Sequence, residues 1–339
     1  MPGRSVVGAL VVAMMVAGGC GGRVGAARER RATSSTTTSI AASPTTSMSA
    51  ASTTSTGAGT GAVDCPAPTA VLTSGVTTVE VDGEQREYRV TLPAAFEPAT
   101  PTPVILDFHG SGSAMNEEFV YSGVANAGPQ RGYLVLTPQG TGSPRGWSLA
   151  GPGKDDAFVE AMLAAVGAGA CVDPHRVFAV GISNGSAYAA LMACRHPDRI
   201  AAVGMVAATL VSLCPVDHPM PAIAFHGTAD PIVPYTGGNV SGRRSGTEAP
   251  GAESAIAQWA QRNGCSPAYD EQAIAADVTR RSWTGCTDDA SVQFFSITGG
   301  GHTWPGALDL AKAGKAYLGA TTQSISATTT FLDFFDRIR

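Results

Sequence analysis

The sequence predicts an α/β fold in which a doubly wound, mostly parallel sheet is covered by helices on both faces. Three observations indicate this. Strand-like and helix-like segments alternate along the chain, several strands are continuously apolar, and several strands end in a glycine-rich loop. In sheets of this kind, functional sites lie beyond the carboxyl ends of the strands. The residues that follow the predicted strands are therefore the candidates for function.

The folded region is expected to open with a hairpin, because two alternating segments flank Asp82-Gly83, a favoured two-residue turn. The predicted strands are 77–81, 88–92, 103–108, 133–137, 176–180, 201–206, 221–225 and 291–297. The predicted helices are 155–166, 187–194, 253–262 and 327–338. The first of these helices begins with Asp155 and Asp156, which suit a helix N-terminus as capping acids.

The composition is that of a globular protein with a substantial core. The chain has 339 residues, of which 44% are hydrophobic and 14% charged, and its formal net charge is −5. There is no basic stripe, so the sequence argues against nucleic acid as a partner.

The N-terminal region is predicted to direct export. Residues 1–20 combine Arg4 with a short apolar run, as in a signal peptide. Residues 17–20 resemble a bacterial lipobox, with Cys20 as the lipidated residue, although Ala17 stands where Leu is more common. The alternative is an ordinary signal peptide cleaved elsewhere. We expect an extracytoplasmic protein, either secreted or held at the membrane by a lipid anchor only.

Residues 21–63 are rich in Ser, Thr, Ala and Gly and are predicted to form a disordered linker. Residues 64–339 then form one folded domain. Of the seven cysteines in the chain, Cys20 precedes this domain. An even number in an exported domain indicates disulfides. The pairs Cys194–Cys214 and Cys265–Cys286 each close a short segment, which leaves Cys65–Cys171 by elimination.

A G-x-S-x-G pattern lies in a setting that favours a nucleophile. Gly181-Ile-Ser183-Asn-Gly185 follows a predicted strand and precedes a predicted helix, the context of a nucleophile elbow. The two glycines remove Cβ atoms that would clash in the strained turn, so the hydroxyl of Ser183 can point outward. The alternative is a serine that serves only the turn.

A serine nucleophile needs a base, and the base needs an acid that orients it. His302 is the candidate base, because it lies on a glycine run after the last predicted strand. Asp230 is the candidate acid, because it follows strand 221–225; Asp217 precedes that strand and should lie at the wrong edge. The alternatives are a solvated loop histidine and an N-capping aspartate.

The oxyanion that forms during such chemistry needs N–H donors. The backbone N–H of Asn184 is one expected donor, and that of Ser111 is the other, with Gly112 close behind. Trp304 is a candidate substrate-binding residue, with a packing role as the alternative. Trp147 is a weaker candidate for lining the same cleft.

Two further His-Gly pairs follow predicted strands, at His109 and His226, and both histidines are expected to be structural. The remaining histidines, His175, His196 and His218, are expected in surface turns.

Together, G-I-S-N-G, H-G-T-A-D-P-I-V-P-Y, G-G-G-H-T-W-P-G and R-G-W resemble the family of poly(3-hydroxybutyrate) depolymerases and feruloyl or acetylxylan esterases. The resemblance extends from about Cys65 to Ile338 and is closest to lipoprotein-type actinobacterial members. It implies an α/β-hydrolase fold with Ser183 as nucleophile, Asp230 as acid and His302 as base, and no metal or organic cofactor. Ser186 stands where many relatives have Gly, which should reduce the space near the elbow.

The expected function is hydrolysis of carboxylic esters, such as hydroxyalkanoate oligomers or feruloyl and acetyl esters, through an acyl-enzyme. The expected partner is the ester itself, as a small molecule, an oligomer or a polysaccharide side group. A serine peptidase or an acyltransferase would show the same three residues. A catalytically inactive binding lipoprotein is the alternative from another class.

Overall fold

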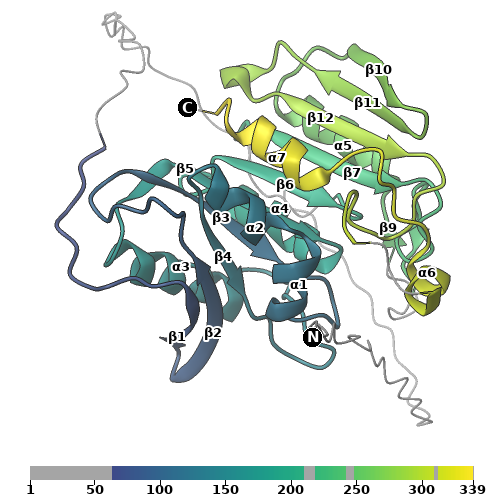
Figure 1. Ribbon diagram of the computed structural model, residues 1–339. Helices are drawn as coiled ribbons and strands as arrows, with labels where there is room; N and C mark the ends of the chain where they lie inside the picture. Colours follow the sequence, from purple (N-terminus) through teal and green to yellow (C-terminus); the bar gives the residue numbers. More distant parts are fainter. Residues whose placement is uncertain (1–62, 210–217, 242–247, 309–311, 339) are drawn as a thin grey trace, which may run out of the picture. The chain divides into compact units, whose positions relative to one another are not determined.

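A ten-stranded sheet forms the centre of the computed structural model (Figure 1). Its order is β1-β2-β4-β3-β5-β6-β7-β12-β11-β10. The strands from β4 to β12 in this order run parallel, and an antiparallel pair extends the sheet at each end. The structure therefore confirms the predicted doubly wound, mostly parallel sheet.

The structure describes residues 63–209, 218–241, 248–308 and 312–338, which belong to the compact unit Val63–Arg339. The sheet strands are β1 (Gly75–Val81), β2 (Glu84–Thr91), β3 (Thr102–Phe108), β4 (Leu134–Pro138), β5 (Val172–Ile182), β6 (Ala202–Val206), β7 (Ala222–Gly227), β10 (Tyr269–Ala275), β11 (Val278–Trp283) and β12 (Val292–Ile297). A separate short pair is β8 (Gly238–Asn239) with β9 (Glu248–Ala249).

The helices are α1 (Met115–Tyr121), α2 (Val124–Gln130), α3 (Lys154–Gly167), α4 (Asn184–Arg195), α5 (Ala252–Arg262), α6 (Lys312–Leu318) and α7 (Ala327–Phe335), and Thr287–Asp289 forms a 3₁₀ turn. No helix in the described ranges is both long enough and apolar enough to cross a bilayer.

Helices cover both faces of the sheet because the central strands are apolar on both sides. In β3, Val104 and Leu106 belong to a core cluster that includes buried residues of α3, α4 and α5. Ile105, which points to the opposite face, belongs to a second cluster that includes residues of α2 and α7. Successive side chains of a strand point to opposite faces, so an unbroken apolar strand needs a cover on each side.

The predicted elements correspond to elements of the structure, with shifted ends. The opening hairpin turns at Asp82 and Gly83, which both have positive φ (50° and 79°), as a two-residue turn of this kind requires. The sequence reasoning missed α1, α2, α6 and the β10–β11 hairpin. Strand β10 is exposed along almost its whole length, so it lacks the alternation of apolar residues by which a strand is detected.

Two of the three predicted disulfides are confirmed. Cys65–Cys171 joins the start of the described chain to the residue before β5, and Cys265–Cys286 joins two segments between α5 and β12. The pair Cys194–Cys214 remains a prediction, because Cys214 lies outside the described residues. The same holds for Cys20, for the signal and linker segments, and for Asp217.

The two acids at the start of α3 are not helix caps. Asp155 and Asp156 are buried, and each forms an ion pair with an arginine: buried Arg86 at 2.9 Å and partly buried Arg195 at 3.1 Å, respectively. Buried carboxylates need such partners, because losing water without a compensating charge or hydrogen bond is costly. These pairs join α3 to β2 and to α4.

Candidate active site

The three candidate catalytic residues follow three strands of the sheet at the same edge. Backbone hydrogen bonds run along this edge from one strand end to the next. The N–H of Ser183 donates to Val206 O at the end of β6 (2.8 Å), and that of Ala207 donates to Phe225 O in β7 (2.9 Å). The N–H of Thr228 donates to Ile297 O at the end of β12 (2.9 Å). The chain segments after β5, β7 and β12 therefore start along one edge of the sheet, with the end of β6 between those of β5 and β7.

Ser183 occupies the strained turn that a nucleophile elbow requires. Its backbone angles are φ 57° and ψ −119°, an unusual conformation for a residue with a side chain. The turn is possible because its flanking glycines are in close contact. A Cβ atom on Gly181 would overlap with the backbone of Gly185, and one on Gly185 would overlap with the carbonyl oxygens of Phe108 and His109.

Ser186, which departs from the family pattern, is fully buried in the first turn of α4. Its hydroxyl donates to the carbonyl oxygen of Ala208. This residue therefore ties the helix to the segment after β6.

His302 and Asp230 form a hydrogen-bonded pair. Nδ1 of His302 lies 2.8 Å from Oδ2 of Asp230, and both side chains are buried. Because a carboxylate only accepts, this contact places a proton on Nδ1 and leaves Nε2 of His302 as the atom that can take a proton from another group. The backbone N–H of His302 donates to Leu318 O at the end of α6, which fixes the loop (2.6 Å).

The carboxylate of Asp230 is held in its charged form. Burial acts to raise its pKa, but the hydrogen bonds from His226 and His302 outweigh burial and lower the pKa below its usual range. The second oxygen, Oδ1, accepts from the backbone N–H groups of Ile232 (2.8 Å) and Val233 (2.9 Å). Asp230 therefore stays an acceptor at neutral pH.

The loop after β3 lies against the elbow. A Cβ atom built on Gly110 would lie 3.5 Å from Cβ of Ser183. The N–H of Gly112 is already bound to Arg145 O (2.7 Å), whereas the N–H of Ser111 has no backbone acceptor in the part of the chain that the structure describes. Asn184 is the first residue of α4, so its N–H has no acceptor within the helix.

A third segment, residues 140–147, ties the elbow to the loop after β3. The Asn184 amide accepts from Trp147 N (2.7 Å) and donates to Trp147 O (3.1 Å). The indole N–H of Trp147 donates to His109 O (2.9 Å), and Nε2 of His109 accepts from Gly140 N (2.9 Å). These contacts were not foreseen from the sequence, because nothing in the S-N-G pattern shows where the asparagine amide points.

Trp147 and Trp304 are both buried and pack in the core, the alternative given for Trp304, and a substrate contact by Trp304 stays a prediction. Trp304 is fully buried, its ring packs edge-on against Phe331, and its indole N–H donates to Thr328 Oγ1 (2.9 Å). Its backbone N–H donates to the hydroxyl of Tyr121 in α1 (3.1 Å). Trp304 thus anchors the His302 loop to the helix that follows the Ser111 loop.

The serine is not hydrogen-bonded to the histidine in this structure, although both residues are described. A nucleophile and its base are often not in hydrogen-bonding contact until a substrate binds. Within the described ranges, no group of three or more His, Cys, Asp or Glu side chains is arranged to hold a metal ion.

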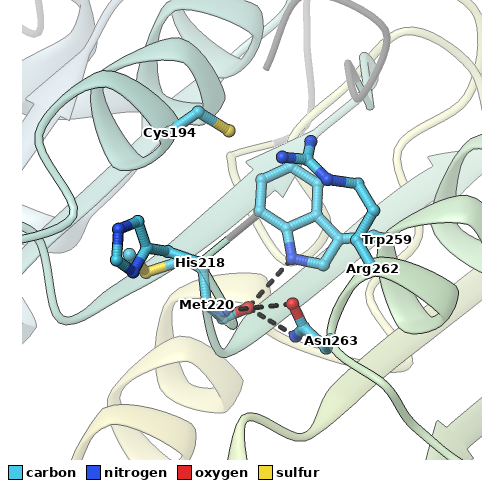
Figure 2. Close-up of a pocket in the computed structure, with 6 residues that line it drawn as sticks. All are labelled: Cys194, His218, Met220, Trp259, Arg262 and Asn263. Carbon is cyan, nitrogen blue, oxygen red and sulfur yellow. Dashed lines mark hydrogen bonds between the residues drawn. The ribbon is translucent and has the colours of Figure 1, made fainter. Parts of the chain in front are cut away.

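The small cavity drawn in Figure 2 belongs to the opposite edge of the sheet. It is lined by Cys194, His218, Met220, Trp259, Arg262 and Asn263. Cys194 lies near the C-terminal end of α4, whereas Ser183 precedes its N-terminal end, and Met220 precedes β7, whereas Asp230 follows it. The indole of Trp259 and the amide of Asn263 both donate to Met220 O, so these hydrogen bonds join α5 to the segment before β7.

The strand order, the elbow after β5 and the His-Asp pair after β12 and β7 define an α/β-hydrolase. Solved structures of that fold are similar to this chain. An acetyl xylan esterase from Aspergillus awamori superposes with a TM-score of 0.50 at 16% identity, covering 68% of this chain and 94% of its own. A thermostable esterase superposes with a TM-score of 0.52 at 16% identity, covering 78% and 63%.

Sequence comparison identifies the family. The family model described as "Esterase PHB depolymerase" matches residues 144–217. NocK of Nocardia uniformis subsp. tsuyamanensis, a protein named as an esterase, is 31% identical over 297 residues, which cover 79% of this chain and 84% of NocK. Feruloyl esterase D of Neurospora crassa is 28% identical over 238 residues, covering 66% and 76%. The chain belongs to the esterase PHB depolymerase family, and its relatives are named as esterases.

Proposed function

We propose that this protein is an exported serine esterase in which Ser183 is the nucleophile, His302 the general base and Asp230 the orienting acid. The observation that carries the proposal is the His302–Asp230 hydrogen bond of 2.8 Å at the strand edge where Ser183 occupies a strained turn. The order serine, acid, histidine along the chain is that of the α/β-hydrolases.

The reaction proceeds in two acyl-transfer steps. Nε2 of His302 takes the proton of the Ser183 hydroxyl as Oγ attacks the ester carbonyl carbon. The N–H groups of Asn184 and Ser111 stabilise the oxyanion that forms. The ester C–O bond then breaks, and the alcohol leaves with the proton that His302 held. Water attacks the acyl-enzyme in the same way, and the carboxylic acid is released.

Asp230 supports these steps without taking part in proton exchange. Its carboxylate accepts from Nδ1 of His302, so the free nitrogen of the neutral ring is Nε2. When His302 becomes an imidazolium, the same carboxylate stabilises the positive charge. The backbone N–H groups of Ile232 and Val233 keep the carboxylate in place.

We further propose that the substrates are carboxylic esters of the classes named for relatives, namely feruloyl, acetyl or hydroxyalkanoate esters. Relatives named feruloyl esterases in fungi support the first of these. A peptidase or acyltransferase reaction is the alternative, since it would use the same three groups. A catalytically inactive binding protein is disfavoured because all three candidate groups are present.

Export is part of the proposal. Disulfides persist in oxidising compartments, and the domain contains the bridges Cys65–Cys171 and Cys265–Cys286. The sequence of residues 1–20 adds a signal segment with Cys20 as the lipidated residue. Replacing Cys20 with Ser should release the protein from a membrane fraction, and unchanged fractionation would reject the anchor.

The decisive experiment compares the wild type with Ser183→Ala and Ser111→Ala. Ser183→Ala should abolish labelling by a fluorophosphonate probe and lower kcat by about 10⁵-fold or more, because no nucleophile remains. Ser111→Ala keeps its backbone N–H and should stay within a few-fold of the wild type. The substrates are methyl ferulate, acetylated xylan and hydroxybutyrate oligomers, with a peptide amide and an acyl acceptor added to test the alternatives. Labelling of Ser183→Ala at wild-type rate would overturn the assignment.

A further inference from the structure

Asp230 has a second imidazole beside it. Nε2 of His226, at the end of β7, lies 3.4 Å from Oδ2 of Asp230, the same oxygen that accepts from His302. Both His226 and Asp230 are buried, with 2% and 7% of their surface exposed. The catalytic scheme above uses only one of these two histidines.

The backbone determines which nitrogen of His226 carries the proton. Nε2 lies 2.9 Å from the carbonyl oxygen of Val233, which can only accept, so Nε2 is the donor. That N–H therefore faces two acceptors, Val233 O and Asp230 Oδ2. Nδ1 has no hydrogen-bond partner in the described part of the chain. The neutral ring therefore has one donor, Nε2–H, which faces both the Asp230 carboxylate and the carbonyl of Val233.

We propose that His226 is a positioning residue that acts through Asp230. Its Nε2–H holds the turn from Asp230 to Val233 against the end of β7 and shares the carboxylate oxygen that serves His302. This inference rests on the proposed function. Asp230 thus accepts three hydrogen bonds, two from the backbone and one from His302, and the Nε2–H of His226 lies 3.4 Å from the oxygen that serves His302. The lowered pKa of Asp230, to which the His226 contact contributes, is consistent with this arrangement.

The shared oxygen has a consequence for the base. A donor on Asp230 Oδ2 withdraws part of the negative charge that would otherwise stabilise the protonated form of His302. Loss of the His226 donor leaves this charge directed at His302 alone and leaves Val233 O without its partner. Among the described residues, the Tyr235 ring packs edge-on against His226, with ring centroids 5.8 Å apart. The Tyr235 hydroxyl donates to Glu253, which in turn pairs with Arg281.

The test compares His226→Gln with His226→Leu. Gln keeps an N–H donor near the position of Nε2, whereas Leu keeps bulk and burial but has no donor. We expect Leu to lower kcat by about 10-fold or more with little change in KM, in the range of a lost catalytic hydrogen bond. The acid limb of the kcat/KM profile should move to higher pH. Gln should restore most of kcat and return the acid limb towards the wild type.

A structural readout separates this inference from the activity itself. The proton on Nδ1 of His302 should give a low-field ¹H NMR signal, because it lies in a charge-assisted hydrogen bond. His226→Leu should shift this signal, and His226→Gln should leave it near the wild-type position.

Two outcomes would overturn the inference. Equal kcat and pH profiles for Leu and Gln, in folded proteins, would show that His226 contributes packing only. An unchanged low-field signal in His226→Leu would show that the Nε2–H of His226 does not act on Asp230. Failure of the proposed function is distinguishable, because then the wild type itself would not label at Ser183.

Discussion

Two buried aspartates near the catalytic edge have opposite pKa shifts. Asp107, in β3 just before the loop that carries Ser111, is fully buried, and burial raises its pKa to about 7. Asp230, after β7, is also buried, yet its pKa is lowered because hydrogen bonds from two histidines outweigh burial. Burial alone therefore does not decide whether a carboxyl group is charged.

The difference lies in the number of donors. Asp230 accepts hydrogen bonds from two backbone N–H groups and from His302, and His226 Nε2 approaches it to 3.4 Å. Asp107 accepts from the hydroxyl of Ser122 (2.7 Å), and the pKa of its neighbour Glu118, which is also fully buried, is raised well above its usual value by burial and by the charge of Asp107. Burial disfavours the charged form of both carboxyls, and a charge on Asp107 disfavours one on Glu118. The surroundings of Asp230 thus favour a carboxylate, and those of Asp107 and Glu118 favour the protonated acid.

Between these two aspartates, the largest expected effect is that of Asp230→Asn. The amide oxygen can still accept from Ile232 and Val233, but an amide N–H that faces Nδ1–H of His302 would force the wrong tautomer. We expect kcat to fall by about 10³- to 10⁴-fold, as in other triads, with the fold retained. Activity within 10-fold of the wild type, measured on p-nitrophenyl acetate, would contradict the role of Asp230.

The same variant has a pH signature. A carboxyl group whose pKa is lower in the folded than in the unfolded state stabilises the fold above the unfolded value, and this contribution is lost as the pH falls below it. The free energy of unfolding of the wild type should therefore decrease more steeply than that of Asp230→Asn as the pH drops from about 4.5 to 2.5. Urea unfolding across this interval measures the difference.

The second largest effect is expected in the segment that follows Asp107, where the backbone carbonyl groups after β3 approach the backbone of Gly185. Gly185→Ala would place a Cβ atom against the carbonyl oxygens of Phe108 and His109. Neither can move without shifting β3 or α4, so we expect a loss of about 4 kcal/mol or more in the free energy of unfolding. Gly167→Ala is the matched control, since nothing lies within 4 Å of its Cβ position. A Gly185→Ala protein with wild-type Tm would refute the close contact.

The sequence predicted the positions of the candidate site residues, but not the side-chain contacts around them. The elbow is encoded locally, since a strand, two glycines and a helix are adjacent in the chain, so the position of Ser183 and the need for Gly181 and Gly185 could be predicted. The acid and base could be placed at strand ends because parallel strands share an edge. The contacts of His226 and the burial of Trp304 depend on side-chain directions and on α7, which is remote in sequence, so the pattern did not indicate them.

The smallest expected effect concerns the carboxyl pair. As the pH rises above the usual range of carboxyl groups towards about 7, the unfolded chain loses protons that the folded pair retains, so stability falls. Asp107→Asn removes one titrating group, and its amide can still accept from Ser122 and donate to Glu118. We expect the free energy of unfolding at pH 8 to rise by about 1–3 kcal/mol, the range for relieving a poorly satisfied buried group. At pH 4 the variant and the wild type should have nearly equal free energies of unfolding.

Asp198→Asn, at an exposed position, is the control and should follow the wild type at both pH values. A variant that loses as much stability as the wild type between pH 4 and pH 8 would show that the pair does not hold the extra proton, and the contrast between the two aspartates would then rest on Asp230 alone.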